Sequence, residues 1–415
     1  MTPEIKQRIE QIRRGEVPEG YKKGKLGIVP EEWNETSFSA LFTSTSDYTD
    51  DLDKYPLYSL TIEDGVTPKT ERYERSHLVK KEDSYKIIRP NDYAYNPMNL
   101  RFGAVARHKG DMPVAVSGYY DIFTTVHESD LPFMDGFLTC GPMITYYNRV
   151  STGSLVEKQR VHFSQFLDFV LPLPSINERA QIASILTTQD KVIELKEKRL
   201  AEKQRQKKYL MQQLLTGKKR LPGFNGAWKA DRLGKMFLER KETNCEGLQM
   251  LAITGTQGII PRRELDLKDN SSEDKSKYLR VCVGDIGYNT MRMWQGVSAY
   301  SNYEGVVSPA YTILKPSLSI NAKYFAYLFK MPEIISLFYR FSQGLVDDTR
   351  NLKYENFKKI KVFYPPDIEE QTAIAEVLSA ADREIDLLRQ DIEQEKQKEK
   401  ALLQLLLTGI VRVNV

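Results

Sequence analysis

The sequence predicts an α/β (α+β) protein: two strand-rich domains separated by a pair of long antiparallel coiled-coil helices, with a pseudo-twofold internal repeat. Three observations lead to this fold. One stretch occurs twice, at 174–217 and 366–409, without gaps and at a constant offset (366 − 174 = 192). Each copy has the heptad spacing of a coiled-coil helix. The segments before the copies, 33–173 and 228–365, contain short alternating runs that favour strands.

Length and composition place the chain among ordinary multi-domain proteins. Its 415 residues exceed what one hydrophobic core usually serves, so two or more domains are expected. The three cysteines (Cys140, Cys245 and Cys282) lie far apart, which favours reduced thiols over a disulfide framework or a zinc site. No apolar run is long enough for a membrane span, and the first residues lack the apolar core of a signal peptide. We therefore expect a cytoplasmic protein that does not bind membranes.

The chain divides into five segments. They are an N-terminal arm (1–32), a first domain (33–173), a central repeat with a long helix (174–227), a second domain (228–365), and a C-terminal repeat with a long helix (366–415). In the arm, a short helix is expected from Glu4 to Arg14, before a Gly/Pro/Lys-rich link. This arm is either an ordinary extension or a segment that docks on the rest of the molecule.

The two domains share a plan but little sequence. Trp33 and Phe42 of the first domain match Trp228 and Phe237 of the second. The stretch from Pro90 to Met98 likewise matches the stretch from Val283 to Met291, and we call such short matching positions marks. Between such marks the domains barely agree. The chain therefore alternates variable domains with shared helices.

The shared segments have the signals of long helices. Ser175 and Asp367 are suitable N-caps, and Gly217 and Gly409 stand where a helix-ending glycine belongs. Every seventh residue forms an apolar seam that is interrupted once in each copy. The seam residues are Leu186, Ile193, Leu200 and Leu214 in the first copy, and Leu378, Ile385, Ile392 and Leu406 in the second.

Opposite charges favour pairing of the two copies with each other. Residues 174–228 contain 12 Lys and Arg against 5 Asp and Glu, whereas residues 366–415 contain 6 against 11. Pairing between unlike copies is therefore favoured over self-pairing with a second molecule. A pseudo-twofold relationship between the halves requires the helices to be antiparallel.

Motifs for catalysis are missing from the sequence. There is no phosphate-binding loop, because Gly217-Lys218-Lys219 follows a helix instead of opening one. Asn96-Pro97-Met98 only partly matches the motif of amino-methyltransferases. Glu194-Leu195-Lys196 matches the end of a nuclease Glu-x-Lys motif, but it lies within the heptad repeat and is interpreted as surface charge. The four histidines are scattered, so no metal site is expected. We predict a non-catalytic protein without a cofactor of its own.

Two unlike domains on a rigid spacer suit a protein that reads two separated DNA sites. Arg, Asn and Gln read base edges, and Lys mainly contacts phosphate. Candidate DNA-binding residues are Lys69, Arg75, Tyr95, Asn96, Arg101, Arg107 and Lys109 in the first domain, and Arg262, Arg263, Lys277, Tyr288, Asn289, Arg292, Trp294, Arg350 and Lys353 in the second. The alternative for each cation is a solvated surface charge. The recurring Tyr-Asn marks either read bases or support the fold.

Taken together, these motifs resemble one known family over essentially the whole chain. The pattern P-x-I-x-E-[RQ]-x-x-I-A-x-[IV]-L occurs at 174–186 and 366–378, and both helices close in Leu-Leu-Thr-Gly. Lys219 to Phe224 leads into Trp228, and Pro30-Glu31-Glu32-Trp33 opens the first domain. This combination looks like the DNA-specificity (S) subunit of type I restriction–modification systems.

The resemblance implies two target recognition domains, each reading one half of a split, asymmetric sequence in double-stranded DNA. It implies that the helices set the half-site spacing and dock two modification (methyltransferase) subunits, together with restriction (translocase/endonuclease) subunits. S-adenosylmethionine, ATP and Mg²⁺ are then expected on those partners. Expected docking residues are Pro174, Ile176, Ile182 and Leu186, with Pro366, Ile368, Ile374 and Leu378 in the second copy.

Two other functions compete with this interpretation. One is a fused restriction–modification enzyme, which the missing catalytic motifs disfavour. The other is a coiled-coil adaptor that binds nucleic acid without sequence specificity. The acidic balance of residues 34–173 (14 Lys and Arg against 19 Asp and Glu) means that a DNA-binding face there has to be a local basic patch.

Overall fold

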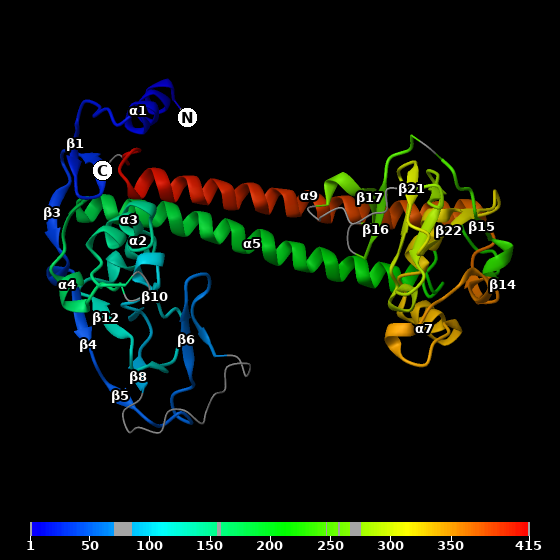
Figure 1. The fold of residues 1–415 in the computed structure, drawn as a ribbon, viewed down its shortest axis with the longest axis horizontal. Helices are drawn as coiled ribbons and strands as arrows, with labels where there is room; N and C mark the ends of the chain where they lie inside the picture. Colours follow the sequence, from blue (N-terminus) through cyan, green and yellow to red (C-terminus); the bar gives the residue numbers. More distant parts are fainter. Residues whose placement is uncertain are drawn as a thin grey trace. The chain divides into compact units, whose positions relative to one another are not determined.

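The computed structural model describes residues 2–69, 85–155, 159–245, 247–255, 258–265 and 275–413. It confirms a mixed α/β fold with two long helices and many short strands (Figure 1). The chain forms two compact units. Unit 1 consists of Met1–Lys196 and Asp391–Val415, and unit 2 consists of Glu197–Gln390. Each unit contains one strand-rich domain and one part of each long helix, so the units cut across the five sequence segments.

The first domain is built on a four-stranded antiparallel sheet with the order β10-β9-β12-β4. Its strands are β4 (Phe42–Thr45), β9 (Tyr93–Tyr95), β10 (Val105–Arg107) and β12 (Asp121–Thr125). Smaller sheets combine β3 (Asn34–Ser37) with β13 (Val170–Leu173), β6 (Tyr58–Thr61) with β7 (Gly65–Pro68), and β5 (Tyr48–Thr49) with β8 (Tyr85–Ile88) and β11 (Val114–Ser117). The helices are α2 (Leu131–Phe137), α3 (Gly141–Val150) and α4 (Phe163–Leu167).

The second domain repeats this topology. Its four-stranded sheet has the order β15-β22-β19-β20. The strands are β15 (Phe237–Arg240), β19 (Ile286–Asn289), β20 (Ser298–Tyr300) and β22 (Tyr311–Pro316). The pairs are β14 (Lys229–Arg232) with β23 (Lys361–Tyr364), β16 (Leu251–Thr254) with β17 (Gly258–Pro261), and β18 (Leu279–Val281) with β21 (Gly305–Val307). The helices are α6 (Ala322–Leu328), α7 (Pro332–Phe341) and α8 (Tyr354–Phe357).

Matching strands by chain order gives the same sheet in both domains. β4, β9, β10 and β12 correspond to β15, β19, β20 and β22, and they take the same neighbours. A parallel bridge from Leu57 to Ala115 likewise corresponds to one from Met250 to Val306. The loosely matching sequences therefore encode one architecture twice.

The long helices are α5 (Ile176–Leu214) and α9 (Ile368–Leu407). Both predicted N-caps are present: Ser175 Oγ accepts from Glu178 N at 3.2 Å, and Asp367 Oδ1 accepts from Glu369 N at 2.8 Å. Just beyond the helices, Gly217 and Gly409 have φ of 71° and 72°. This left-handed conformation suits glycine, which has no Cβ to clash.

Interhelical ion pairs show antiparallel pairing inside each unit. In unit 1, Lys196 Nζ lies 2.9 Å from Asp391 Oδ1 and 2.8 Å from Glu395 Oε1. In unit 2, Lys203 Nζ lies 2.8 Å from Glu384 Oε1, and Lys207 pairs with Asp382. Each contact joins a cation of α5 to a carboxylate of α9, as the unequal charge of the two copies predicts.

The predicted seam residues line the helix contacts and the domain cores. Leu186 and Leu406 belong to the core of unit 1, and Leu214 and Leu378 belong to the core of unit 2. Ile193, Ile385 and Ile392 are also buried, whereas Leu200 is half-buried. The heptad pattern therefore identified side chains that stabilise both the helix pairs and the domains.

The N-terminal arm packs within unit 1. It consists of α1 (Pro3–Arg13), close to the predicted helix, and a hairpin of β1 (Tyr21–Gly24) and β2 (Gly27–Pro30). The Tyr21 hydroxyl donates to Gly409 O at 2.8 Å, and Arg8 donates to Ile410 O at 3.0 Å. The arm is thus fastened to the C-terminal end of α9. Within the described ranges, no helix is both long and apolar enough to cross a membrane.

Candidate nucleic-acid interface

A hairpin in each domain presents a cation at the same place. The β6–β7 hairpin ends in Pro68-Lys69, and the β16–β17 hairpin ends in Pro261-Arg262. Lys69 N donates to Leu57 O at 3.1 Å, and Arg262 N donates to Met250 O at 2.9 Å. The matched backbone bonds show that Lys69 and Arg262 occupy equivalent positions. Both residues are among the predicted DNA contacts.

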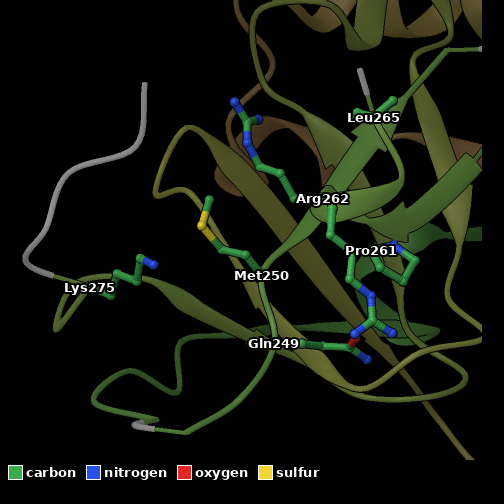
Figure 2. A pocket seen from close by; sticks show the side chains of 7 residues that line it. Gln249, Met250, Pro261, Arg262, Leu265 and Lys275 are labelled. Atoms are coloured by element: carbon green, nitrogen blue, oxygen red, sulfur yellow. The ribbon is translucent and has the colours of Figure 1, made fainter. Parts of the chain in front are cut away.

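In the second domain, the end of this hairpin borders a hollow of about 370 Å³. Figure 2 shows Arg262 and Lys275 beside Met250 and Gln249. The lining residues are Gln249, Met250, Pro261, Arg262, Arg263, Leu265 and Lys275. Three of these are cations and none is acidic. Among the described residues, this hollow has the composition that suits a phosphate backbone.

A hollow at another place in the first domain, beside the tip of the β6–β7 hairpin, has mixed charge. Its volume is about 380 Å³, and it is bordered by Arg107 and Lys109, but also by Glu63, Asp64 and Asp135. Arg107 Nη2 donates to Asp135 Oδ2 at 2.7 Å, and Lys109 lies 3.5 Å from the same oxygen. Arg107 is therefore held in the domain by Asp135, whereas the largely exposed Lys109 is the better candidate for a phosphate contact.

The predicted tyrosine contacts are wrong. Tyr95 and Tyr288 are both 0% exposed, so neither ring offers a surface to a base. The Tyr95 hydroxyl donates to Val161 O at 2.6 Å, and Tyr288 stacks on Phe357. Both rings are core residues at matched places in β9 and β19. Their recurrence in otherwise divergent domains reflects the fold, which was the alternative left open by the sequence.

Asn96 and Asn289 have a structural function next to these tyrosines. Asn96 Oδ1 accepts from Met98 N at 3.1 Å, and Asn289 Oδ1 accepts from Met291 N at 3.0 Å. Both amides cap the turn that follows β9 or β19. Their side-chain oxygens are therefore already occupied, which disfavours the predicted reading of adenine.

Three further candidates are engaged inside their own domains. Arg101 donates to Gln159 at 3.1 Å, Trp294 Nε1 donates to Met291 O at 2.9 Å, and Arg350 lies 4.0 Å over the ring of Tyr339. The exposed candidates are Lys69, Lys109, Arg263, Lys277, Arg292 and Lys353. Arg75 lies outside the described residues.

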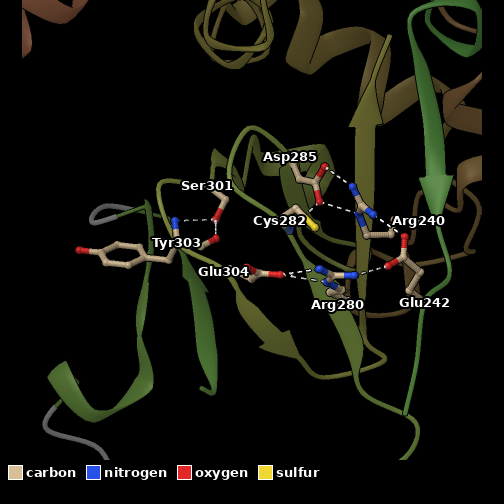
Figure 3. A network of polar contacts seen from close by, with 8 residues as sticks. All are labelled: Arg240, Glu242, Arg280, Cys282, Asp285, Ser301, Tyr303 and Glu304. Atoms are coloured by element: carbon tan, nitrogen blue, oxygen red, sulfur yellow. Dashed lines mark hydrogen bonds and ion pairs between the residues drawn. The ribbon is translucent and has the colours of Figure 1, made fainter. Parts of the chain in front are cut away.

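Sequence reasoning missed a polar network in the second domain (Figure 3). Arg240 on β15 donates to both oxygens of Asp285, at 2.7 and 3.1 Å. Next to it, Arg280 on β18 bridges Glu242 and Glu304. These contacts join β15, β18 and the start of β21, and they neutralise both arginines within the domain. The signal was present, since Asp285 matches Asp92 in the repeated mark.

The predicted subunit-docking residues divide by burial. Burial corrects the docking prediction for five residues, which pack inside the units and offer no surface to a partner: Pro174, Ile182, Leu186, Ile374 and Leu378. Ile176, Pro366 and Ile368 are exposed and stay candidates for contact with a partner.

The repeated entry motif forms a joint between helix and domain. Arg179 donates from Nε and Nη2 to both oxygens of the buried Asp130, at 2.8 and 3.1 Å. At the matching positions of unit 2, Gln371 Oε1 accepts from Asn321 N at 2.8 Å. The alternation of Arg and Gln in the E-[RQ] motif therefore reflects one charged and one neutral version of the same joint.

The glutamate of the motif accepts hydrogen bonds from an arginine that follows the other copy of the repeat. Glu178 in α5 accepts from Arg412 Nε at 2.6 Å and Nη2 at 3.0 Å. Glu370 in α9 accepts from Arg220 in the same bidentate way. The start of each repeat is thus fastened to the residues that follow the other repeat, within its own unit. Since Arg220 and Arg412 are also 192 residues apart, the repeat offset could have identified this pair.

The geometry defines a class of protein: two copies of one strand-rich domain, each fastened to a repeated helix, with cations at matched hairpins. Among the described residues, no three His, Cys, Asp or Glu side chains gather as a metal site. A family model for the type I restriction modification DNA specificity domain matches residues 269–397, which cover much of the second domain and most of α9.

Comparisons over the full length agree with this class. A protein of Methanocaldococcus jannaschii assigned as a type I restriction enzyme MjaX specificity subunit is 24% identical, over 95% of this chain and 97% of the relative. The crystal structure of a type I restriction–modification S subunit from M. genitalium superposes with a TM-score of 0.53 at 13% identity, covering 92% of this chain and 97% of that chain.

A chain from a structural study of complex assembly and conformational transition of the type I R-M system gives the same TM-score of 0.53, at 14% identity, covering 92% of this chain and 99% of that chain. At these identities, the two structures show the shared fold. By the matched domain and the full-length relative, the chain is similar to the specificity subunits of type I restriction–modification systems.

Proposed function

We propose that each strand-rich domain reads one half of a bipartite, asymmetric target in double-stranded DNA. The observation that carries this proposal is the identical strand order of the two four-stranded sheets, combined with unlike loops. One architecture used twice supports one mode of DNA contact used twice. The unlike loops support two different half-sites.

Charge supports different strengths of phosphate contact in the two domains. The hollow of the second domain is lined by Arg262, Arg263 and Lys275 and no carboxylate. The hollow of the first domain contains three acidic residues beside its cations. We infer that the exposed Lys69 and Lys109 make the phosphate contacts of the first domain, while Arg107 holds the domain together.

The long helices are proposed to set the distance between half-sites and to bind the enzyme partners. The exposed Ile176 and Ile368 occupy matched positions in the first turns of α5 and α9. Matched apolar positions suit two identical modification subunits. Restriction subunits then join that complex. The methyl donor, ATP and Mg²⁺ belong to these partners, and this chain is the non-catalytic cytoplasmic subunit.

A domain exchange tests the proposal. The full chain is co-expressed with the modification subunit of its own system, and methylated sites are mapped across the host genome. Exchanging residues 34–173 for the corresponding domain of another family member should change one half of the methylated sequence. A matched exchange of 229–365 should change the other half. Alteration of both halves by one exchange would contradict separate reading by each domain.

A gel shift with random duplexes and the co-expressed modification subunit addresses the competing functions. A sequence-selective shift supports a specificity subunit. A shift without selectivity at any salt concentration would instead favour the coiled-coil adaptor. Methylation or cleavage by this chain alone would favour the fused enzyme.

A further inference from the structure

A closed loop follows α7 in the second domain and projects a leucine into solvent. The loop begins at Gln343 and ends at Asn351, and the backbones of these two residues exchange a pair of hydrogen bonds. Gln343 N donates to Asn351 O at 2.8 Å, and Asn351 N donates to Gln343 O at 2.7 Å. Within the loop, Leu345 is 100% exposed. A single exposed leucine is ordinary on a protein surface, so its surroundings decide whether it has a function.

Contacts within the loop hold this leucine in a defined place. The Arg350 guanidinium lies 4.0 Å from the centre of the Tyr339 ring, and its Nη2 donates to the Tyr339 hydroxyl at 3.1 Å. Gly344 has a φ of 137°, and a Cβ there would lie 2.7 Å from Thr349 O, so the close approach of the two sides of the loop requires glycine. Leu345 is therefore presented by a preorganised loop, which loses little entropy on binding.

The first domain has an equivalent loop after α3. Its ends are joined in the same way, since Thr152 N donates to Arg160 O at 2.9 Å and Arg160 N donates to Thr152 O at 3.0 Å. Leu155 in this loop is 51% exposed, and residues 156–158 lie outside the described residues. Two domains that barely agree in sequence thus both expose a leucine from the loop after the same helix, which favours a common use of the two side chains.

Apolar and cationic side chains surround the Leu345 loop. Met291 and Tyr339 are exposed, and the Trp294 ring lies 6.0 Å from that of Tyr339. The carboxylate of Asp347 in the loop is paired with Arg350 at 3.2 Å. Three exposed cations flank these residues, and within the described part of the chain none of them forms an ion pair: Arg292, Arg340 and Lys353.

This combination of side chains suits duplex DNA. Unpaired cations around a projecting side chain match the phosphates on either side of a groove. Leucine and methionine are among the apolar side chains that enter DNA between neighbouring bases and partly unstack them. An acidic protein surface is the alternative partner, but a single pointed loop offers it little of the area of about 800 Å² per partner that a stable protein interface buries. Charge and shape therefore favour DNA.

We propose that Leu345 is a wedge that enters one base step of the half-site read by the second domain, and that Leu155 does the same in the other half-site. The wedge rests on the proposed reading of duplex DNA by the two domains, and it specifies one apolar contact within that reading. Arg350 is a positioning residue, because it holds the loop against Tyr339. Arg292 and Lys353 contact the flanking phosphates.

Base unstacking measured by fluorescence tests the wedge. The full chain, in complex with the modification subunit of its own system, is mixed with duplexes that carry its methylated target. The fluorescent base 2-aminopurine replaces one base at a time across both half-sites, except at the methylated adenines, where the methyltransferase itself extrudes a base. Binding should raise the fluorescence at one step of each half-site, because unstacking relieves quenching. Leu345→Ala should remove the rise in one half-site only and weaken binding by about tenfold. Leu155→Ala should act on the other half-site.

Leu318→Ala is the matched control, because Leu318 is an equally exposed leucine of the same domain in the turn after β22. This variant should keep both the fluorescence rise and the affinity. If Leu345→Ala behaves like Leu318→Ala while the wild-type complex binds its target selectively, the wedge is wrong and the proposed function stands. Weaker association of Leu345→Ala with the modification subunit, at unchanged fluorescence, would assign the loop to a protein contact and also overturn the wedge. Absence of selective binding by the wild-type complex would overturn the proposed function itself.

Discussion

Arg220 donates hydrogen bonds from Nε and Nη2 to both carboxylate oxygens of Glu370, the second at 2.7 Å. Arg220 lies just beyond the end of α5, and Glu370 lies in the first turn of α9. Glu370 is 1% exposed, so its charge depends on this partner. The corresponding Arg412 and Glu178 form the same pair in unit 1, which makes this ion pair a repeated element of the fold.

Removing Arg220 should destabilise unit 2 strongly. Arg220→Ala leaves the buried Glu370 carboxylate without its cation, and we expect a loss of about 3 kcal/mol in the free energy of unfolding. Urea unfolding measures the change. Arg14→Ala is the matched control, because Arg14 and Glu10 form an exposed pair on α1 worth under about 0.5 kcal/mol. Equal losses in the two variants would mean that the Glu370 pair contributes no more than a surface ion pair.

Tyr95 should affect stability and leave DNA recognition unchanged. Tyr95→Phe removes the hydroxyl that donates to Val161 O at 2.6 Å and leaves a buried carbonyl without that partner. We expect the free energy of unfolding to fall by about 1–3 kcal/mol. The methylated sequence, measured in cells that express the variant, should be the same. A changed target at unchanged stability would restore the base-reading role that burial argues against.

Lys330 should make the stability of unit 2 rise with pH in the alkaline range. Its ammonium donates to Gly296 O at 2.8 Å and Ser298 O at 2.6 Å, and burial lowers its pKa to about 8. Between pH 8 and the unfolded value near 10.4, the unfolded chain binds more protons, so folding becomes more favourable as pH rises.

Urea midpoints from pH 7.5 to 10 measure this slope, with Lys330→Met as the comparison. The variant removes the titrating amine, so its midpoint should change less steeply with pH than that of the wild type. Parallel profiles for the two proteins would assign the slope to other groups.

Matched insertions in the long helices should change the distance between half-sites. One added heptad after Lys196 and one after Gln390 preserve the seam and lengthen the pair by about 10.5 Å. That length corresponds to about three base pairs. Methylome mapping should show the same half-site bases with a longer spacer. Replacing one heptad by another of equal length is the control, and an unchanged spacer in the insertion variant would refute the role of the helices in spacing.

Local patterns predicted the helices well, because their signals are short-range. The caps at Ser175 and Asp367, the glycines at Gly217 and Gly409, and the heptad seam all depend on residues within a few turns. The pairing of the two copies followed from their unlike charges, and its antiparallel direction followed from the pseudo-twofold relationship between the halves. The strand order of the domains could not be predicted in this way, because it depends on contacts between residues far apart in sequence.

The binding residues were harder to predict than the fold. Arginine is the residue type that most often contacts DNA. Arg107, Arg240 and Arg280 are nevertheless each paired with a carboxylate from another segment of the domain. Tyr95 and Tyr288 recur in both domains because the core requires them. A cation in a sequence does not reveal whether a distant acid neutralises it.

The sequence by itself determined that the chain is an internal duplication with two long, oppositely charged helices and two divergent strand-rich domains. Repeats, periodicity and charge are properties of the order of residues. Only the tertiary structure decided which charges remain available, because long-range contacts join Arg412 to Glu178 and Arg179 to Asp130. It also decided how the interruption of the α5 seam is satisfied, since Lys207 meets Asp382 of α9, which lies 175 positions further along the chain.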